Sequence, residues 1–165
     1  RVIYIGTFSK VLFPSVRVGY LVVPPDLVDT FRSVRIATDI FPPYLVQEVL
    51  TDFLTSGQFA RHIRRMRTLY KSRYFALVDS LRAEFGDSLE IHGAEAGMHL
   101  SVILPDSYSD RAVAARAAAE NLWLWPISHC WSGNQLRQGL ILGFGNTDSE
   151  KMLPAVQHLR RILAL

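Results

Sequence analysis

Two basic side chains near the start of the chain have no charged neighbours. Lys10 and Arg17 are the only charged residues between positions 2 and 25, where every other residue is apolar, small or uncharged. A buried cation is costly unless an anion meets it, so the stretch predicts either a distant carboxylate partner or a bound anion. Thr7 and Ser9 place two hydroxyls beside the lysine. A lone lysine is ordinarily a solvated amine, and the residues alone leave an anion site and that interpretation evenly balanced.

Two predicted strands must hold these side chains in place. Residues 2–8 and 17–23 are rich in Val, Ile, Tyr and Leu, which favours strands, and Pro14 keeps the connection between them irregular. Gly6 and Gly19 leave room for a ligand to approach the backbone. These apolar flanks predict that much of the segment is buried.

The rest of the chain predicts helices mixed with short strands. The segment after Pro24 predicts a helix from Asp26, as its capping acceptor, to about residue 37, and Thr147 with Glu150 predicts a capping box at the start of the last helix. Apolar residues recur every three or four positions from 59 to 81, the pattern of one long amphipathic helix that Gly86 ends. The other expected elements are helices at 44–55 and 110–121 and strands near 89–92, 98–104, 122–127 and 139–145. This order predicts two packed units joined by the long helix, in an α/β or α+β arrangement.

Composition limits the class of protein. The chain has 165 residues, 49% of them apolar and 20% charged, which excludes a disordered tail, and no apolar run is long enough for a membrane span. The single cysteine, Cys130, excludes an internal disulfide framework, and the spacing of the histidines predicts no metal site. A strand that begins at residue 1 without an initiator Met suggests a piece of a longer chain. No leader peptide is apparent, so the expected location is cytoplasmic.

A cluster of basic residues on the long helix allows three interpretations: a nucleic-acid patch, a solvated helix face, or a face toward a dimer partner. A solvated face is the simplest account, because the cluster mostly lies off the apolar stripe. Its members are Arg61, Arg64, Arg65, Arg67, Lys71 and Arg73.

The stretch around Lys10 resembles a known cofactor-binding segment. Gly6-Thr7-Phe8-Ser9-Lys10, followed by Pro14 and by Arg17-Val18-Gly19-Tyr20, is similar to the lysine segment of fold-type I enzymes that use pyridoxal 5'-phosphate (PLP). The resemblance implies that Lys10 forms the Schiff base with PLP and that Arg17 clamps the phosphate, with Thr7 and Ser9 as hydroxyl donors. An amine in an apolar pocket is a usable nucleophile, and a guanidinium binds phosphate as a planar fork.

The resemblance also implies a fold and a domain division. It implies an α/β, aminotransferase-like fold in which residues 1–57 are the end of the large PLP-binding domain. Residues 58–165 are then the linking helix and the small C-terminal domain.

Three further stretches, at 53–67, 93–100 and 139–144, resemble the aminotransferase-like domain of MocR-type regulators, a branch of the GntR family. That resemblance implies a homodimeric, PLP-binding domain that senses an amino acid or a PLP-derived effector. It also implies that DNA is bound only through a winged-helix domain upstream of this chain.

One position departs from the pattern of working aminotransferases. Ile141 stands where those enzymes carry the arginine that pairs the substrate α-carboxylate, and Arg137 is displaced by about 13 Å along a strand and is expected at the surface. The leading prediction is therefore an effector-sensing domain, and the alternative is an active aminotransferase that transfers an amino group from an amino acid to a 2-oxo acid. A third interpretation is that residues 1–165 alone form a folding and dimerisation unit with weak or no PLP binding. In the family, the acid that pairs the pyridine nitrogen and the aromatic residue that stacks on the ring lie upstream of the lysine.

Overall fold

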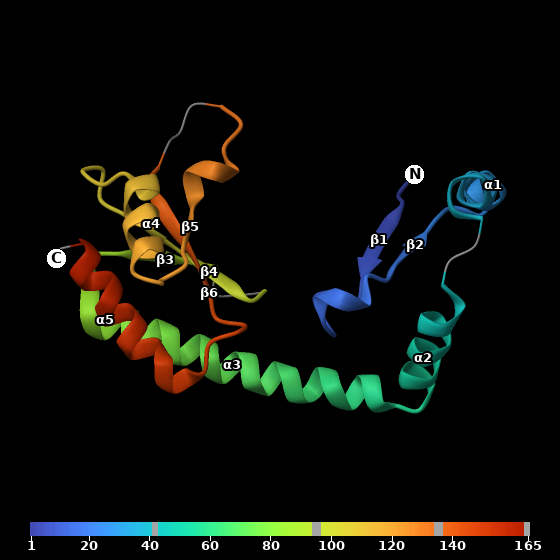
Figure 1. Ribbon diagram of the computed structural model, residues 1–165, viewed down its shortest axis with the longest axis horizontal. Helices are drawn as coiled ribbons and strands as arrows, with labels where there is room; N and C mark the ends of the chain where they lie inside the picture. The colour runs from blue at the N-terminus through green and yellow to red at the C-terminus, as the bar shows by residue number, and fades with distance from the viewer. Residues whose placement is uncertain (41–42, 94–96, 134–136, 164–165) are drawn as a thin grey trace. The chain divides into compact units, whose positions relative to one another are not determined.

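The computed structural model describes residues 1–40, 43–93, 97–133 and 137–163, and the chain divides into two compact units, Arg1–Arg65 and Met66–Leu165 (Figure 1). The first unit contains β1 (Tyr4–Thr7), β2 (Gly19–Val22), α1 (Val28–Asp39) and α2 (Tyr44–Thr55), with short 3-10 turns at Pro14–Val16 and Pro25–Leu27. Helix α3 (Gln58–Phe85) begins in the first unit and continues into the second. The second unit adds β3 (Glu90–His92), β4 (His99–Ile103), α4 (Asp110–Ala119), β5 (Trp125–Pro126), β6 (Gly139–Gly143) and α5 (Met152–Leu163), with 3-10 turns at Ile127–Cys130 and Ser149–Lys151.

In the first unit, β1 and β2 form an antiparallel ribbon whose register runs from Tyr4 opposite Val22 to Thr7 opposite Gly19. Both strands are shorter than the predicted ranges. The expected burial is wrong for this chain, because Ile5 is 74% and Val22 57% exposed. A two-stranded ribbon cannot bury its own apolar side chains, and nothing in the described part of the chain covers them.

Helix α1 begins without the predicted cap. Its N-cap residue is Leu27, which makes no side-chain capping bond, whereas the Asp26 carboxylate pairs with the Arg1 guanidinium at 2.9 Å. The ion pair therefore engages the carboxylate that was predicted to cap the helix. Helix α2 has the predicted bounds, and Gly57, at φ +77°, follows it in the left-handed region.

The second unit is built on an antiparallel sheet of order β3-β4-β6-β5. Alternate residues of its two central strands point into the core, and all four are at most 5% exposed: Leu100, Val102, Leu140 and Leu142. The alternation places Ser101 and Ile141 on the opposite face, where they are only half-buried. The sheet thus has one buried face and one open face.

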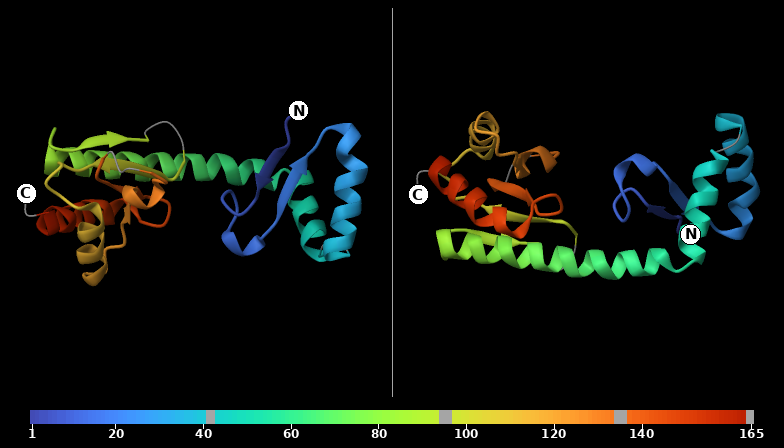
Figure 2. Two further views of the ribbon diagram at one scale, coloured as in Figure 1. Left: turned by 90° about the horizontal axis from the view of Figure 1, so that it is seen from above. Right: turned by 60° about the horizontal axis from the view of Figure 1, so that its bottom comes forward.

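Helices α3, α4 and α5 cover the buried face. The core residues of α3 lie in its second half, and those of α5 form one apolar stripe. Figure 2 shows α5 running alongside the second half of α3. The Gln157 amide and the Arg160 guanidinium of α5 donate to the Glu84 carboxylate of α3, at 2.9 and 3.2 Å. These hydrogen bonds lower the pKa of Glu84 below its ordinary value. They fasten α5 along α3 at the rim of the core.

The predicted capping box at the last helix is wrong. The N-cap residue of the turn that leads into α5 is Asp148, and no side chain caps it. Asp148 instead accepts from Arg73 at 2.7 Å, and the same guanidinium donates to the Gly145 carbonyl. Arg73, at 14% side-chain exposure, is therefore a structural residue of the second unit rather than part of a solvated face.

The long helix is confirmed, and it extends four residues beyond the predicted stripe, to Phe85. Gly86, at φ +56°, ends it in the backbone region that glycine adopts most easily. In the described residues, no helix combines the length and the apolar content that a membrane span requires.

Candidate functional site

Lys10 lies in a tight turn that directly follows β1. The Phe8 N–H donates to the Val18 carbonyl at 3.0 Å and extends the ribbon by one rung. The N–H groups of Val11 and Leu12 donate back to the Phe8 carbonyl, at 3.2 and 2.8 Å. The turn places the Lys10 side chain at the surface of the first unit, where it is exposed. Its amine can therefore be reached by a carbonyl ligand.

The two hydroxyls beside the lysine are in different situations. Thr7 Oγ1 accepts the Ser9 N–H at 3.2 Å and lies 3.5 Å from the Val18 carbonyl oxygen, to which it donates. The Thr7 hydroxyl thus shapes the turn. Ser9 is half-buried, and its hydroxyl makes no hydrogen bond to the described residues. Of the two, Ser9 is the hydroxyl available to a ligand.

Arg17 ends the 3-10 turn with a left-handed backbone, at φ +47° and ψ +34°. A residue with a Cβ pays about 1–2 kcal/mol for this conformation, so the surrounding turn imposes it. The Arg17 guanidinium lines a cavity of about 630 Å³, whereas Lys10 is not among the lining residues. The structure therefore joins Lys10 and Arg17 through one turn but does not bring both side chains into one cavity.

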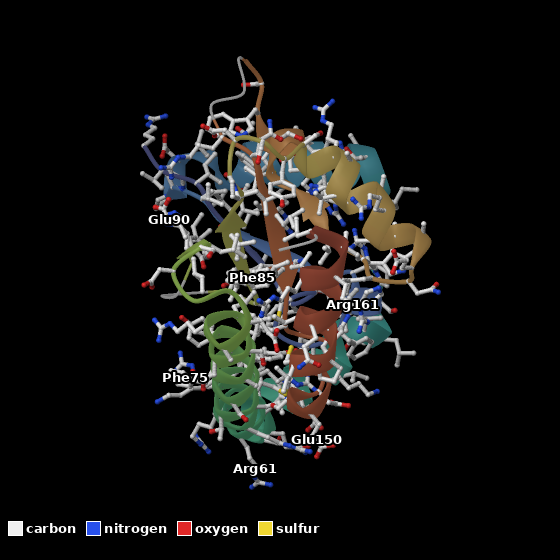
Figure 3. All side chains as sticks on the ribbon, turned by 90° about the vertical axis from the view of Figure 1, so that its left-hand side faces the viewer. Arg61, Phe75, Phe85, Glu90, Glu150 and Arg161 are labelled. Atoms are coloured by element: carbon white, nitrogen blue, oxygen red, sulfur yellow. The ribbon has the colours of Figure 1, made fainter. Side chains whose placement is uncertain are left out.

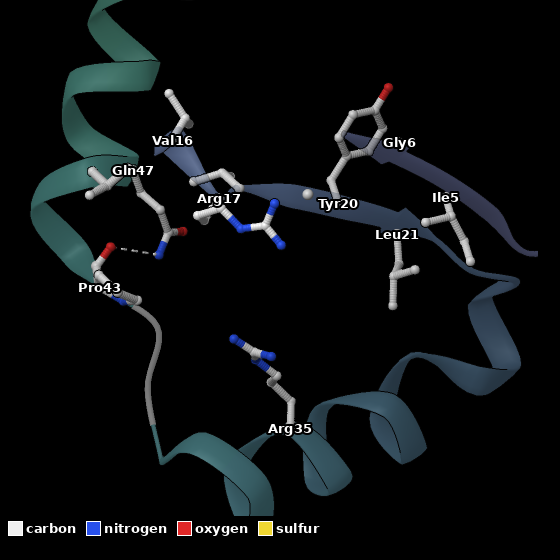
Figure 4. A pocket seen from close by; sticks show the side chains of 12 residues that line it. Ile5, Gly6, Val16, Arg17, Tyr20, Leu21, Arg35, Pro43 and Gln47 are labelled. Atoms are coloured by element: carbon white, nitrogen blue, oxygen red, sulfur yellow. Dashed lines mark hydrogen bonds between the residues drawn. The ribbon is translucent and has the colours of Figure 1, made fainter. Parts of the chain in front are cut away.

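A second guanidinium faces the same cavity. In Figure 4 the side chains of Arg17 and Arg35 point toward each other across it, with Gln47 at its side. The Gln47 amide donates to the Pro43 carbonyl at 3.3 Å, and Arg35 pairs with Asp39, which does not line the cavity, at 2.5 Å. Two guanidiniums in a cavity without a lining carboxylate suit an anion. Arg35 carries no signal in the sequence, because it lies on a helix 18 positions from Arg17.

An aromatic cluster fixes the lysine turn within the first unit. His62 Nε2 lies 2.8 Å from the Val11 carbonyl oxygen, one residue beyond the lysine. Phe8 packs edge-on against Phe59, and Phe53 packs against both Phe59 and His62. The position of His62 gives no signal in the sequence, because its partner is 51 residues away.

Gly6 does not leave space for a ligand, contrary to prediction. The ring of Tyr20, its cross-strand partner, fills that space, and a Cβ on Gly6 would lie 2.2 Å from it. The Tyr20 ring also packs on Phe8. A hydrogen bond with the Tyr4 side chain, together with electrostatic repulsion between the two phenols and desolvation, raises the pKa of Tyr20.

The second unit contributes the open face of its sheet. The strand register places His92, Ser101, Ile141 and Trp125 in one row across this face. No guanidinium or ammonium belongs to this row. Arg137 is exposed and donates to Glu90 at 3.2 Å, as expected of a surface residue. Position 141, at which working aminotransferases are expected to carry a carboxylate-binding arginine, therefore presents an apolar side chain.

The tryptophans are not core residues. Trp123, Trp125 and Trp131 are 81%, 57% and 40% exposed. Trp125 packs edge-on against the His129 ring at 5.3 Å.

Comparison with known proteins agrees with the fold and with the sequence resemblance. Residues 1–158 match the family "Aminotransferase class I and II". The chain belongs to this family. It is 39% identical over 160 residues to "Probable rhizopine catabolism regulatory protein MocR" of Rhizobium meliloti, and this match covers 97% of the chain and 32% of that protein. It is 32% identical to "Uncharacterized HTH-type transcriptional regulator YhdI" of Bacillus subtilis, over 97% of the chain and 34% of that protein.

The chain thus spans about a third of the length of these two relatives. Among solved structures, the α-aminoadipate aminotransferase LysN of Thermus thermophilus, complexed with N-(5'-phosphopyridoxyl)-L-leucine, is 28% identical with a TM-score of 0.87. That match covers 99% of the chain and 42% of LysN. The predicted fold class, α/β and aminotransferase-like, is confirmed. Of the regulator-like stretches, 93–100 includes residues 94–96, which lie outside the described part of the chain.

Proposed function

We propose that this chain is part of a PLP-binding, aminotransferase-like domain that senses an effector in a MocR/GntR-type transcriptional regulator. Lys10 is the amine to which the cofactor attaches by a Schiff base, and Arg17 is the principal partner of its phosphate. The observation that carries the proposal is the lysine turn itself. In a chain of this family, the turn presents a reachable amine directly after β1, beside a Ser9 hydroxyl that makes no hydrogen bond to the described residues.

The residues present fit the cofactor in type. The amine of Lys10 suits the aldehyde, and the guanidiniums of Arg17 and Arg35 suit a phosphate. Bound PLP supplies an electron sink, and the protein supplies binding and orientation. Thr7 shapes the turn through its hydroxyl, and Ser9 donates to the phosphate region. Residues 1–57 belong in this proposal to the large cofactor-binding domain and 58–165 to the linking helix and the small domain.

The apolar side chain of Ile141 favours a sensor over a catalyst. In the second unit the open sheet face offers Ile141 between Ser101 and Trp125, and Arg137 is paired with Glu90. An isoleucine cannot hold the α-carboxylate of an amino acid in the orientation that transamination requires. The effector is therefore an amino acid bound through other contacts or a PLP-derived compound.

Two further parts of the proposal rest on the relatives. MocR and YhdI are named as a regulatory protein and an HTH-type transcriptional regulator, which supports a DNA-binding domain upstream of this chain in the full-length protein. We also propose that the full-length protein is a homodimer located in the cytoplasm. The alternative function, an active aminotransferase, is favoured by the similarity to LysN at 28% identity.

A sensor and an aminotransferase can be distinguished by the response of the bound cofactor to amino acids. The full-length protein, saturated with PLP, is titrated with a panel of amino acids while its absorption spectrum is recorded. A sensor shows a saturable spectral shift that is reversed when the amino acid is dialysed away. An aminotransferase instead converts the cofactor to its amine form and releases a 2-oxo acid, and this outcome would refute the sensor.

The chain provides its own controls for the lysine. It contains three lysines, Lys10, Lys71 and Lys151, and the second and third lie on exposed helical positions. Lys10→Ala is expected to abolish the cofactor absorption band, whereas Lys71→Ala and Lys151→Ala retain it.

A further inference from the structure

The first half of α3 carries the most one-sided charge distribution in the chain. Between Asp52 and Asp79 the sequence contains six Arg or Lys residues and no Asp or Glu. Four of the six are exposed and have no acidic partner among the residues that the structure describes: Arg61, Arg65, Arg67 and Lys71. We call these four residues the α3 basic stripe.

The stripe lies on one side of a single continuous helix. At 3.6 residues per turn, its members fall within an arc of about 160°, and they span about 15 Å along the axis. The opposite side carries the partly buried residues Phe59, Ile63, Met66 and Tyr70. Figure 3 views α3 nearly end-on, and the labelled Arg61 side chain projects away from the helix.

The stripe does not stabilise the helix that carries it. Arg61 and Arg65, and Arg67 and Lys71, are like charges four residues apart, a spacing at which they repel. The positive end of the helix dipole lies at Gln58, close to Arg61, and adds to this repulsion. The one described contact of a stripe cation is the approach of the Lys71 ammonium to the Phe75 ring, 6.0 Å from its centroid, which leaves the charge unneutralised. An external anion would remove the repulsion.

We propose that the α3 basic stripe binds the phosphate backbone of duplex DNA when the full-length regulator is on DNA. This inference rests on the proposed function, because the upstream domain is what brings DNA to the molecule. Duplex DNA presents about one negative charge per 1.7 Å of axis, so a stripe of 15 Å meets several phosphates at once. Three of the four cations are arginines, whose planar fork matches a phosphate. The contacts are to the backbone, so the stripe adds affinity and salt dependence but no sequence preference.

The test compares two full-length variants that lose the same charge. The stripe variant is Arg61→Gln/Arg65→Gln/Arg67→Gln/Lys71→Gln. The control variant removes three arginines and one lysine outside the stripe, all exposed and without a described ion pair: Arg82→Gln/Arg116→Gln/Lys151→Gln/Arg161→Gln. Binding to a mixed-sequence 30-base-pair duplex is measured by fluorescence anisotropy from about 50 to 200 mM salt, the range over which phosphate contacts change affinity most visibly.

The stripe variant is expected to bind at least about tenfold more weakly at the lowest salt concentration. The magnitude of its slope of log K against log salt is expected to fall by about two to four, because each phosphate contact contributes about 0.9. The slope of the control variant is expected to differ from the parent slope by no more than about 0.9, the contribution of one phosphate contact. Circular dichroism of both variants establishes that they are folded, and glutamine is a good helix former.

Each of the other outcomes overturns either the stripe inference or the proposed function. Equal slopes for the parent and the stripe variant, with DNA still bound, overturn the stripe inference and leave the proposed function standing. Equal losses in the stripe and control variants also overturn it, because net charge alone then explains the effect. An unchanged slope with a changed sedimentation mass identifies the stripe as a protein interface instead. A parent protein that binds no DNA overturns the regulator function, and this inference with it.

Discussion

At the scale of single residues, ligand binding depends on which side chains of the lysine turn remain available. Thr7 and Ser9 are equivalent in the sequence, yet the Thr7 hydroxyl is engaged in the turn and the Ser9 hydroxyl is not. Arg35 joins Arg17 in one cavity although no motif marks it. The types of the site residues could be predicted from the sequence, but their availability depends on backbone geometry.

The side chain at position 141 is the residue that most favours a sensor over a catalyst. Replacing Ile141 with Arg places a guanidinium in the row between Ser101 and Trp125. A charge-assisted hydrogen bond is worth about 1.5–3 kcal/mol, so the Ile141→Arg variant is expected to bind α-amino acids at least about tenfold more tightly. The measurement is a spectral titration of the PLP-loaded full-length protein.

Ile141→Gln is the matched control, because it adds a polar side chain of similar length without the charge. Equal affinities in the Arg and Gln variants would show that position 141 does not face the amino acid.

At the scale of elements, the periodic patterns were sufficient to place most helices and strands. Helices α2 and α3, the two strands of the ribbon and the four strands of the second sheet all lie where the apolar spacing predicts them. The predicted cap at Asp26 failed because Arg1 pairs with that carboxylate, and the predicted cap at Thr147 failed because Asp148, which pairs with Arg73, is the N-cap residue instead. Those pairs join residues 25 and 75 positions apart, which local patterns do not encode.

One buried carboxylate joins three elements of the second unit. Asp110, at the start of α4, is 1% exposed, and its Oδ2 accepts the N–H groups of Ser128 and Gly139 at 2.9 and 3.3 Å. Asp110→Ala leaves both donors buried without a partner and is expected to cost about 2–4 kcal/mol of unfolding free energy. Asp110→Asn retains one acceptor oxygen and is expected to cost less. Its amide can replace Oδ1, which has no partner in the described residues.

Urea unfolding of the 1–165 chain measures both variants, because the tryptophan fluorescence arises from the second unit. Asp106→Ala, at an exposed position of the same segment, is the control. A cost for Asp110→Ala no larger than that of the control would mean that the carboxylate does not hold these elements together.

At the scale of the whole molecule, the chain corresponds to only part of the relatives that it matches. It spans about a third of two regulators with which it shares 39% and 32% identity. The apolar ribbon residues Ile5 and Val22 are exposed, although their sequence predicts burial. The sequence predicted the family through its motifs, but burial could not be predicted, because it depends on surfaces that the ribbon cannot supply.

We propose the homodimer and the upstream DNA-binding domain as features of the full-length protein. Substitutions of the exposed tryptophans of the second unit can test the homodimer, and substitutions in the α3 basic stripe can test DNA binding.

The attachment of the cofactor to Lys10 can be tested by chemical trapping. The full-length protein is incubated with PLP, reduced with borohydride, digested and mapped by mass spectrometry. We expect a phosphopyridoxyl group on the peptide that contains Lys10, none on Lys71 or Lys151, and loss of the label in Lys10→Ala. A label on another lysine, or no label on protein shown to be folded, would contradict this attachment.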